Sequence, residues 1–341
     1  RRRYSSIRVC IGPLSVLPIA TRRMFMILFL ANVTNLNCKI FASPPQIRTL
    51  ATQNSIMISE QHFRDELIRI INNGIREDVG PGDYSSLACI PVNGPGRAHL
   101  LVKDEGILAG VDFARMIFGF VDSRLDFRPV LKDGDRVKKG DIAFEVHGRA
   151  QSILKAERLV LNSMQRMSAI ATKTNKYVQL LEGTGAKILD TRKTTPGFRA
   201  AEKWAVTIGG GENHRFALYD MIMLKDNHID FCGGITPAIE KTKKYLADHN
   251  LDLKIIVEAR NLDEVAEILR SEGIHRILLD NFTYEMTREA VKMVGAKTQT
   301  ESSGNINEST IREYGACGVT YISSGALTHS IYNMDLSLKA F

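Results

Sequence analysis

Charged side chains directly follow a series of short apolar runs in the second half of the chain. Cations at these positions would bind anionic groups through charge-assisted hydrogen bonds. Acids after two neighbouring runs suit Mg²⁺ that is held mainly by water and substrate oxygens. These residue types predict a phosphorylated substrate, a second anionic substrate and magnesium. The cations are Arg192, Lys193, Arg215 and Lys225, with His214 beside them, and the acids are Glu258 and Asp280.

Other sites are compatible with the same residues. A buried network of ion pairs, with Arg192 bound to Asp280 as an example, is the structural alternative. A zinc site has less support, because His214 and His228 do not form a helical His-x-x-x-His pair. The glycines 209–211 are not followed by Gly-Lys-Ser/Thr, so they are not a Walker loop. They would still let the backbone approach an anion.

The apolar runs alternate with helical patterns, which predicts a parallel sheet and most economically a β/α barrel. In a barrel the carboxyl ends of the strands open on one face, so the charged residues would meet there. A doubly wound open sheet is the alternative, but no Gly-x-Gly-x-x-Gly lies between a strand and a helix. The expected strands are Lys187–Asp190, Met221–Lys225, Lys254–Glu258, Arg276–Asp280, Thr298–Ser302 and Val319–Ser323.

The part of the chain before residue 183 has a different pattern of apolar residues. Apolar residues from Phe63 to Ile75 recur at helical spacing, and short strands broken by glycine follow within residues 97–149. A long helix is expected from about Lys155 to Glu182, because apolar residues including Met164 and Met167 recur on one face. These patterns predict a small α/β domain that leads into the barrel.

The composition is that of a soluble globular protein, with 341 residues, 44% hydrophobic and 24% charged. Residues 1–59 hold eight basic residues and no acid, which leaves 37 basic and 38 acidic residues in the remainder. The net charge of +7 therefore does not predict a nucleic-acid partner. No apolar run approaches the length of a membrane span. Five cysteines without a Cys-x-x-Cys pair fit a reducing compartment and a cytoplasmic protein.

Residues 1–56 have three interpretations. They could be upstream sequence that the protein does not need, which we favour because the chain does not begin with Met and Met57 precedes the first acid, Glu60. The arginine-rich, acid-free composition also fits a transit peptide to a plastid or mitochondrion. If Met24 were the start, Phe25–Ala31 could be a signal-peptide core. We expect no packed structure in this segment under any of the three interpretations.

Five motifs give the chain a specific resemblance. In order from about Glu60 to Phe341, the sequence resembles quinolinate phosphoribosyltransferase, the carboxylating nicotinate-nucleotide pyrophosphorylase. The Thr-Arg-Lys-Thr-Thr-Pro-Gly block is highly specific. The motifs are Thr191–Gly197, Gly209–Arg215, Lys225–His228, Leu279–Asn281 and Glu301–Asn305.

The resemblance implies an N-terminal α/β sandwich and an incomplete, seven-strand-type β/α barrel in an obligate homodimer. The expected divisions are a non-core extension at 1–56, the sandwich at 57–165, the barrel at 166–325, and a tail at 326–341 that packs back on the sandwich. Arg158 is similar to the arginine that the family donates across the dimer. From the sequence alone Arg158 would be an exposed helix residue.

The resemblance also implies roles for individual residues. Thr191, Arg192, Lys193, His214, Arg215 and Lys225 would bind quinolinate and the phosphates, and Glu258 and Asp280 would lie near the ribose hydroxyls and Mg²⁺. Lys193, Glu258 and Asp280 are the expected catalytic residues. The 5′-phosphate would bind at Ser303, Gly304, Asn305 and Gly325. The sequence departs from the family where Asn305 replaces the glycine of some members and Ala259 replaces a polar residue.

The implied reaction joins quinolinate to phosphoribosyl pyrophosphate (PRPP) and releases pyrophosphate and CO₂, without an organic cofactor. Three alternatives stay open. A sister enzyme that uses nicotinate, with one carboxylate, would need fewer cations. The segment from Lys132 to Asp141 resembles the hairpin of biotinyl or lipoyl carriers, with Lys132 as the modifiable lysine. A barrel that binds a ligand without catalysis is the third alternative.

Overall fold

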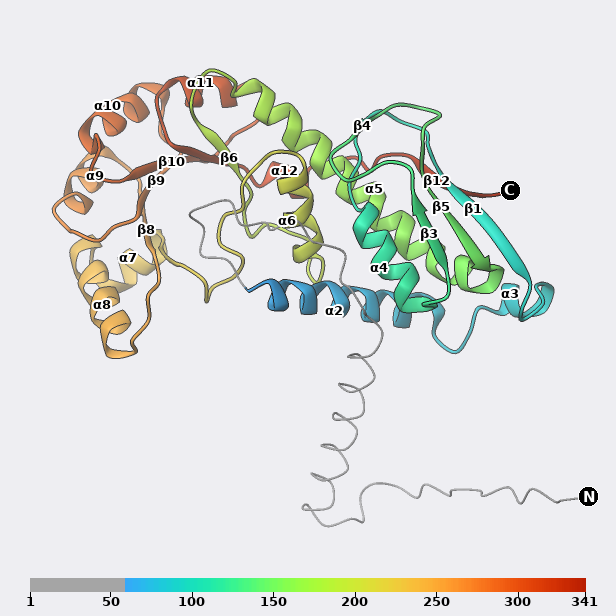
Figure 1. The fold of residues 1–341 in the computed structure, drawn as a ribbon. Coiled ribbons are helices and arrows are strands. Elements are labelled where there is room, and N and C mark those ends of the chain that lie inside the picture. The colour runs from blue at the N-terminus through green and yellow to red at the C-terminus, as the bar shows by residue number, and fades with distance from the viewer. Residues whose placement is uncertain (1–58) are drawn as a thin grey trace, which may run out of the picture. The chain divides into compact units, whose positions relative to one another are not determined.

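The computed structural model describes residues 59–341. The expectations for residues 1–56 therefore lie outside the described residues. Within them, a mostly antiparallel N-terminal part and a parallel β/α barrel are joined by one long helix (Figure 1). Among residues 59–341, no helix is both long enough and apolar enough to span a membrane.

The first helix follows the expected periodicity. Helix α2 spans Glu60–Val79, and the Ser59 hydroxyl caps it by accepting the His62 N–H at 3.1 Å. Phe63 and Leu67 lie on its buried face. The helices and strands that follow in the N-terminal part are α3 (Tyr84–Cys89), β1 (Pro95–Val102), β2 (Gly106–Ile107), α4 (Val111–Val121), β3 (Asp126–Pro129), β4 (Arg136–Val137) and β5 (Ile142–Arg149).

The main N-terminal sheet contains a strand from the far end of the chain. Its order is β12-β1-β5-β3 with antiparallel pairing, while β2 and β4 form a separate two-stranded ribbon. Strand β12 (Leu336–Ala340) pairs with β1 in a register that sets Leu336 opposite Val102. Figure 1 shows the red C-terminal strand beside β1, so residues after the barrel return to the N-terminal part.

The turn around Lys132 is fixed to the body of the protein. The Asp133 carboxylate accepts the backbone N–H groups of Val111 at 2.8 Å and Asp112 at 3.3 Å, at the start of α4. An acid at a helix N-terminus is a favourable cap. A carrier module needs its lysine on a turn that projects freely, so this anchoring disfavours the carrier alternative.

Helix α5 (Ala150–Leu180) connects the two parts, and the expected boundary at 165/166 falls inside it. Met164 and Met167 are fully buried, which confirms that the methionine stripe belongs to the core. The helix contacts α2, α4 and α6 (Arg199–Ile208), as well as strands of both parts. It therefore holds the N-terminal part and the barrel in one continuous core.

The barrel strands confirm the six expected runs, within one or two residues at each end. They pair in parallel in the order β6-β11-β10-β9-β8-β7, which follows the chain except that β6 pairs with the last strand. This order is that of a barrel and not of a doubly wound sheet. Residue Glu212 adds an isolated parallel bridge to Leu189 in β6. The strands are β6 (Lys187–Leu189), β7 (Ile222–Leu224), β8 (Ile255–Ala259), β9 (Arg276–Asp280), β10 (Gln299–Ser303) and β11 (Tyr321–Ser323).

Helices between these strands cover the outside of the barrel (Figure 1). The Asn261 side chain caps α9 by accepting the Glu264 N–H at 2.9 Å. Beyond α6, the helices are α7 (Asp226–Cys232), α8 (Ile235–Asp248), α9 (Leu262–Ile268), α10 (Tyr284–Val294), α11 (Ile311–Ala316) and α12 (Ala326–His329).

Candidate active site

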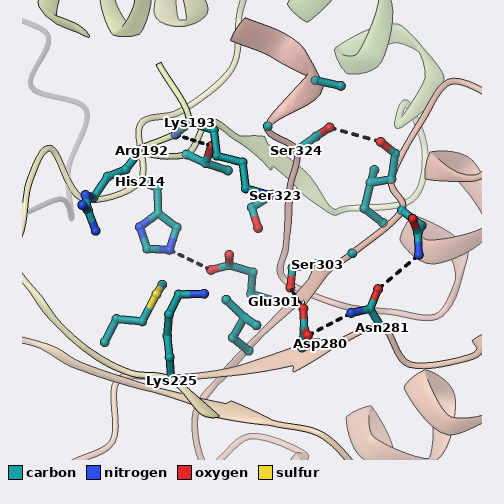
Figure 2. Close-up of a pocket in the computed structure, with 18 of the residues that line it drawn as sticks. Arg192, Lys193, His214, Lys225, Asp280, Asn281, Glu301, Ser303, Ser323 and Ser324 are labelled. Atoms are coloured by element: carbon teal, nitrogen blue, oxygen red, sulfur yellow. Dashed lines mark hydrogen bonds and ion pairs between the residues drawn. The ribbon is translucent and has the colours of Figure 1, made fainter. Parts of the chain in front are cut away.

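A cavity of about 790 Å³ opens at the carboxyl ends of the barrel strands. Its walls come from the segments that follow β6, β7, β9, β10 and β11, so residues far apart in the sequence meet in one place (Figure 2). Most of the predicted site residues line it. These are Thr191, Arg192, Lys193, His214, Arg215, Lys225, Asp280, Ser303, Gly304, Asn305 and Gly325.

Two predicted residues do not line this cavity. Arg158 is exposed on α5 and has no hydrogen bond or ion pair within residues 59–341. Glu258 is buried in β8, where one carboxylate oxygen lies 3.1 Å from Lys225 Nζ and the other accepts the Asp226 N–H at 3.3 Å. The expected role of Glu258 near the ribose hydroxyls and Mg²⁺ stays a prediction. In this structure it is the counter-ion that holds Lys225.

One side of the cavity is positively charged and lacks matching acids. Within residues 59–341, the side chains of Arg192 and Lys193 have no acidic partner. The Arg192–Asp280 ion pair, given as an example of the structural alternative, does not form. Arg215 is buried, with its guanidinium donating to the Met221 carbonyl at 3.1 Å, and burial and the nearby Arg192 charge lower its pKa. Cations without an acidic partner, such as Arg192 and Lys193, are suited to an anionic ligand.

The loop that carries Arg192 and Lys193 is held by side chains from α5 and α6. Buried Glu202 accepts the Thr195 N–H at 3.1 Å and pairs with Arg166 of α5 at 2.6 Å. Arg199 donates to the Thr194 hydroxyl at 2.9 Å and to the Phe216 carbonyl at 3.2 Å. These contacts join the loop after β6 to the segment that follows Arg215.

A buried ion pair lies behind His214. Lys203 of α6 and Asp190, directly after β6, are both buried, and Lys203 Nζ lies 2.5 Å from Asp190 Oδ1. The same carboxylate oxygen accepts the His214 N–H at 2.8 Å, and Lys203 Nζ donates to the His214 carbonyl at 3.1 Å. Breaking a buried pair of this kind leaves one charge uncompensated, which costs about 3–5 kcal/mol. The pair therefore fixes the backbone that presents His214.

The His214 ring is constrained on both nitrogens. Its Nδ1 accepts the Arg215 backbone N–H at 2.7 Å, and a nitrogen that accepts a hydrogen bond carries no proton. Nε2 lies 3.3 Å from Glu301 Oε2 (Figure 2), and Arg276 donates to that oxygen at 2.7 Å. Burial raises the pKa of Glu301, but these two neighbours outweigh it and lower the pKa to about 2.

Asp280 lies on the opposite side of the cavity from Arg192 (Figure 2). Its Oδ1 accepts the Ser303 hydroxyl at 2.9 Å, and its Oδ2 accepts the Asn281 side-chain amide at 2.9 Å. Each oxygen keeps a further lone pair for a ligand. A single carboxylate fits Mg²⁺ that is bound mainly by water and substrate phosphates. Within residues 59–341, no cluster of three His, Cys, Asp or Glu residues could hold a metal on its own.

The segments after β10 and β11 present backbone to the cavity. Within residues 59–341, the N–H groups of Gly304, Asn305 and Gly325 have no hydrogen-bond acceptor. Gly304 has φ +91°, and a Cβ there would lie 2.1 Å from Asn281 Oδ1. Asn305 has φ +54°, a left-handed conformation that glycine and asparagine adopt most readily. Asparagine at position 305 is therefore compatible with the backbone that the loop requires.

Sequence reasoning missed several residues of the site. Glu301, Asn281 and His329 line the cavity, although no role was predicted for them. Glu301 and Asn281 lie at the strand ends that the motifs identified, so their position in the sequence could have indicated that they line the cavity. Asp190 also ends an expected strand, but its buried partner Lys203 gave no such indication, because a charged residue on a helix is ordinarily exposed.

Comparisons with known proteins agree with this geometry. The family description "Quinolinate phosphoribosyl transferase, N-terminal domain" matches residues 83–168, and the corresponding C-terminal domain matches residues 170–339. A Nicotiana tabacum protein named quinolinate phosphoribosyltransferase [decarboxylating] 1b is 42% identical over 313 residues, which cover 86% of this chain and 89% of that protein. An Arabidopsis thaliana protein named nicotinate-nucleotide pyrophosphorylase [carboxylating], chloroplastic, is 44% identical over 293 residues, covering 82% and 84%.

Solved structures give the same result. The nicotinate-nucleotide pyrophosphorylase from Francisella tularensis superposes with a TM-score of 0.77 at 36% identity, covering 85% of this chain and 100% of that chain. NadC from Streptococcus pyogenes gives a TM-score of 0.75 at 37% identity, covering 85% and 98%. Both domains, their order and the overall fold therefore match, and the chain belongs to the quinolinate phosphoribosyltransferase family.

Proposed function

We propose that this chain catalyses the reaction for which its relatives are named. Quinolinate and PRPP would give nicotinate mononucleotide, pyrophosphate and CO₂, a step in de novo NAD biosynthesis. The proposal depends mainly on one observation, which is that two sides of the cavity differ in charge. Arg192 and Lys193, which have no acidic partner among residues 59–341, lie on one side, and Asp280 with the loop 303–305 forms the other. Such a cavity suits a diacid on one side and a phosphorylated sugar on the other.

The cationic side would hold quinolinate. Arg192 and Arg215 present guanidinium groups that suit the two carboxylates, and Lys193 adds a third charge. Holding both carboxylates aims the ring nitrogen at C1 of the ribose, which is a positioning effect. Nicotinate has one carboxylate and would leave part of this charge uncompensated, so the proposal favours quinolinate over nicotinate.

The opposite side would hold PRPP. The free N–H groups of Gly304, Asn305 and Gly325 suit the 5′-phosphate, and Asp280 suits the ribose and the positive charge that develops at C1 as pyrophosphate leaves. Mg²⁺, when bound near Asp280, would supply neutralisation of the leaving pyrophosphate. Lys193 is proposed as a catalytic cation beside that leaving group, where Gly325 leaves room for its stem.

Decarboxylation would need no further cofactor. Once the ring nitrogen is bonded to ribose C1, it carries a positive charge. The bond between the ring and the adjacent carboxylate then breaks, and its electron pair stays on the ring carbon while CO₂ departs. A proton from solvent then bonds to that carbon in place of the carboxylate.

We further propose that the active unit is a homodimer. Arg158 is exposed, has no partner within residues 59–341 and does not reach this chain's cavity, which supports a role at the cavity of a second copy. An exposed arginine is suited to a phosphate or carboxylate brought by another subunit.

We propose that the protein acts in an organelle, the alternative to the cytoplasm that the sequence left open. Relatives from Nicotiana tabacum and Arabidopsis thaliana are named mitochondrial and chloroplastic. The basic, acid-free composition of residues 1–59 supports the same location. A fusion of residues 1–59 to a fluorescent protein should be imported into one of these organelles, and a diffuse cytoplasmic signal would contradict the proposal.

The activity itself is tested by offering the purified protein PRPP and Mg²⁺ with either quinolinate or nicotinate. Chromatography of the products should show nicotinate mononucleotide from quinolinate and little or none from nicotinate. Turnover of nicotinate alone would move the chain to the sister activity. Turnover of neither acid would favour a binding barrel without catalysis.

A further inference from the structure

Asn281 lies between the two parts of the proposed PRPP side. Its side-chain amide donates to Asp280 Oδ2 at 2.9 Å (Figure 2). Its carbonyl oxygen accepts the Asn305 side-chain amide at 3.2 Å. The orientation of the Asn281 amide follows from its partner, because an ionised carboxylate can only accept hydrogen bonds. The oxygen must therefore face Asn305, which must donate. A continuous chain of side chains links the Asp280 carboxylate to the loop 303–305.

The backbone at both asparagines is specialised for this contact. Asn281 has φ +55° and Asn305 has φ +54°, so both residues are left-handed. Gly304 directly precedes Asn305 in the sequence and lies against Asn281 in space. A Cβ at position 304 would lie 2.1 Å from Asn281 Oδ1. The amide of Asn281 thus occupies the space that a side chain at position 304 would need.

We propose that Asn281 is a positioning residue that couples the Asp280 carboxylate to the phosphate loop 303–305 through Asn305. The inference rests on the proposed function, because it takes PRPP as the ligand that spans both places. A ligand phosphate that orders the loop would hold Asn305, which would in turn hold Asn281 and the Asp280 carboxylate. Glycine at position 305 cannot make this contact, so the coupling belongs to chains with asparagine there.

The contact is poorly suited to a purely structural role. Both asparagines are exposed, and Asp280 Oδ1 keeps its hydrogen bond from Ser303 when Asn281 is absent. Removing either amide therefore leaves the core and the strand pairing of β9 with β10 unchanged. The loss should appear in the binding of PRPP and not in thermal stability.

The test is a double-mutant cycle with glycine substitutions. Asn281→Gly and Asn305→Gly each remove the amide while keeping a residue that adopts positive φ without strain. Asn250→Gly is the matched control, because Asn250 is exposed at φ +50° after α8, outside the cavity lining. Calorimetry measures the dissociation constant of PRPP with Mg²⁺, and turnover of quinolinate is followed in the same preparations.

Each single variant should weaken PRPP binding about tenfold, as expected for a hydrogen bond in a chain that ends on a charged group. The double variant should be no weaker than about the worse single variant, because the two amides act through one chain. The KM for quinolinate should stay within twofold of the wild-type value, and Asn250→Gly should bind PRPP normally.

The coupling would be overturned if the losses of PRPP binding free energy in the two single variants added up in the double variant. It would also be overturned if Asn305→Gly bound PRPP normally. A wild-type protein that binds PRPP without consuming quinolinate would overturn the proposed function alone, because the binding cycle still measures the coupling. A wild-type protein that does not bind PRPP would overturn both.

Discussion

Replacing Arg192 with glutamine should separate quinolinate binding from stability. The guanidinium has no acidic partner within residues 59–341 and is exposed at the cavity, so its removal breaks no structural ion pair. The loss of one positive charge near Arg215 also removes a repulsion, since the Arg192 charge contributes to the lowered pKa of Arg215. The free energy of unfolding should therefore change by no more than about 0.5 kcal/mol.

The effect on catalysis should be large. A hydrogen bond to a charged group contributes about 1.5–3 kcal/mol, which corresponds to about 10- to 150-fold in kcat/KM for quinolinate. PRPP binds on the other side of the cavity, so its dissociation constant should change much less. Steady-state kinetics with each substrate varied in turn measures the first quantity, and calorimetry with PRPP measures the second.

Arg288→Gln is the matched control, because Arg288 is an exposed arginine on α10 outside the cavity lining. It should leave both substrates unaffected. An Arg192→Gln protein with wild-type KM and kcat for quinolinate would refute the assignment of the cationic side. A large drop in the thermal midpoint would show instead that Arg192 has a structural role.

Further predictions concern stability, loop geometry and assembly. Gly304→Ala should weaken PRPP binding at least about tenfold, because its Cβ would overlap Asn281 Oδ1 and φ is +91°; calorimetry that shows normal binding would contradict this. The pKa of Glu301 is lowered from 4.5 to about 2, so its contribution of about 3 kcal/mol should be present above pH 4.5 and lost as the pH falls towards 2. Urea unfolding between pH 3 and 7 should show this loss in the wild type and a flatter profile in Glu301→Gln. An inactive Arg158→Ala protein mixed with inactive Arg192→Ala should regain activity through hybrid dimers, and no regain after subunit exchange would count against a shared site.

The fold was largely predictable because alternating apolar runs and helical patterns leave few arrangements of a parallel sheet. The methionine stripe of α5 was visible for a similarly local reason, because its apolar residues recur on one helical face. Strand β12 pairs with β1 from the other end of the chain. The hydrophobic pattern of β12 does not indicate which strand it pairs with, so this pairing could not be predicted from the sequence. The resemblance implied a returning tail without specifying the register of Leu336 against Val102.

The site was predictable as a set of strand ends but not as a set of contacts. Glu258 and Glu301 are both paired in register with Leu278, so they lie at one level of the barrel. The register between strands cannot be read from a sequence. For the same reason the sequence could not show that Lys225 forms an ion pair with Glu258. Asn281 was also missed, because its positive φ and its place above Gly304 depend on how two neighbouring strands end.

The most direct test of the account is the stoichiometry of the reaction. Purified protein would be supplied with quinolinate labelled in the carboxylate next to the ring nitrogen, together with PRPP and Mg²⁺, and CO₂, pyrophosphate and nicotinate mononucleotide would be counted. The account predicts one of each product per quinolinate consumed, and no labelled CO₂ when PRPP is omitted. Release of CO₂ without PRPP, or formation of a nucleotide that retains both carboxylates, would contradict it.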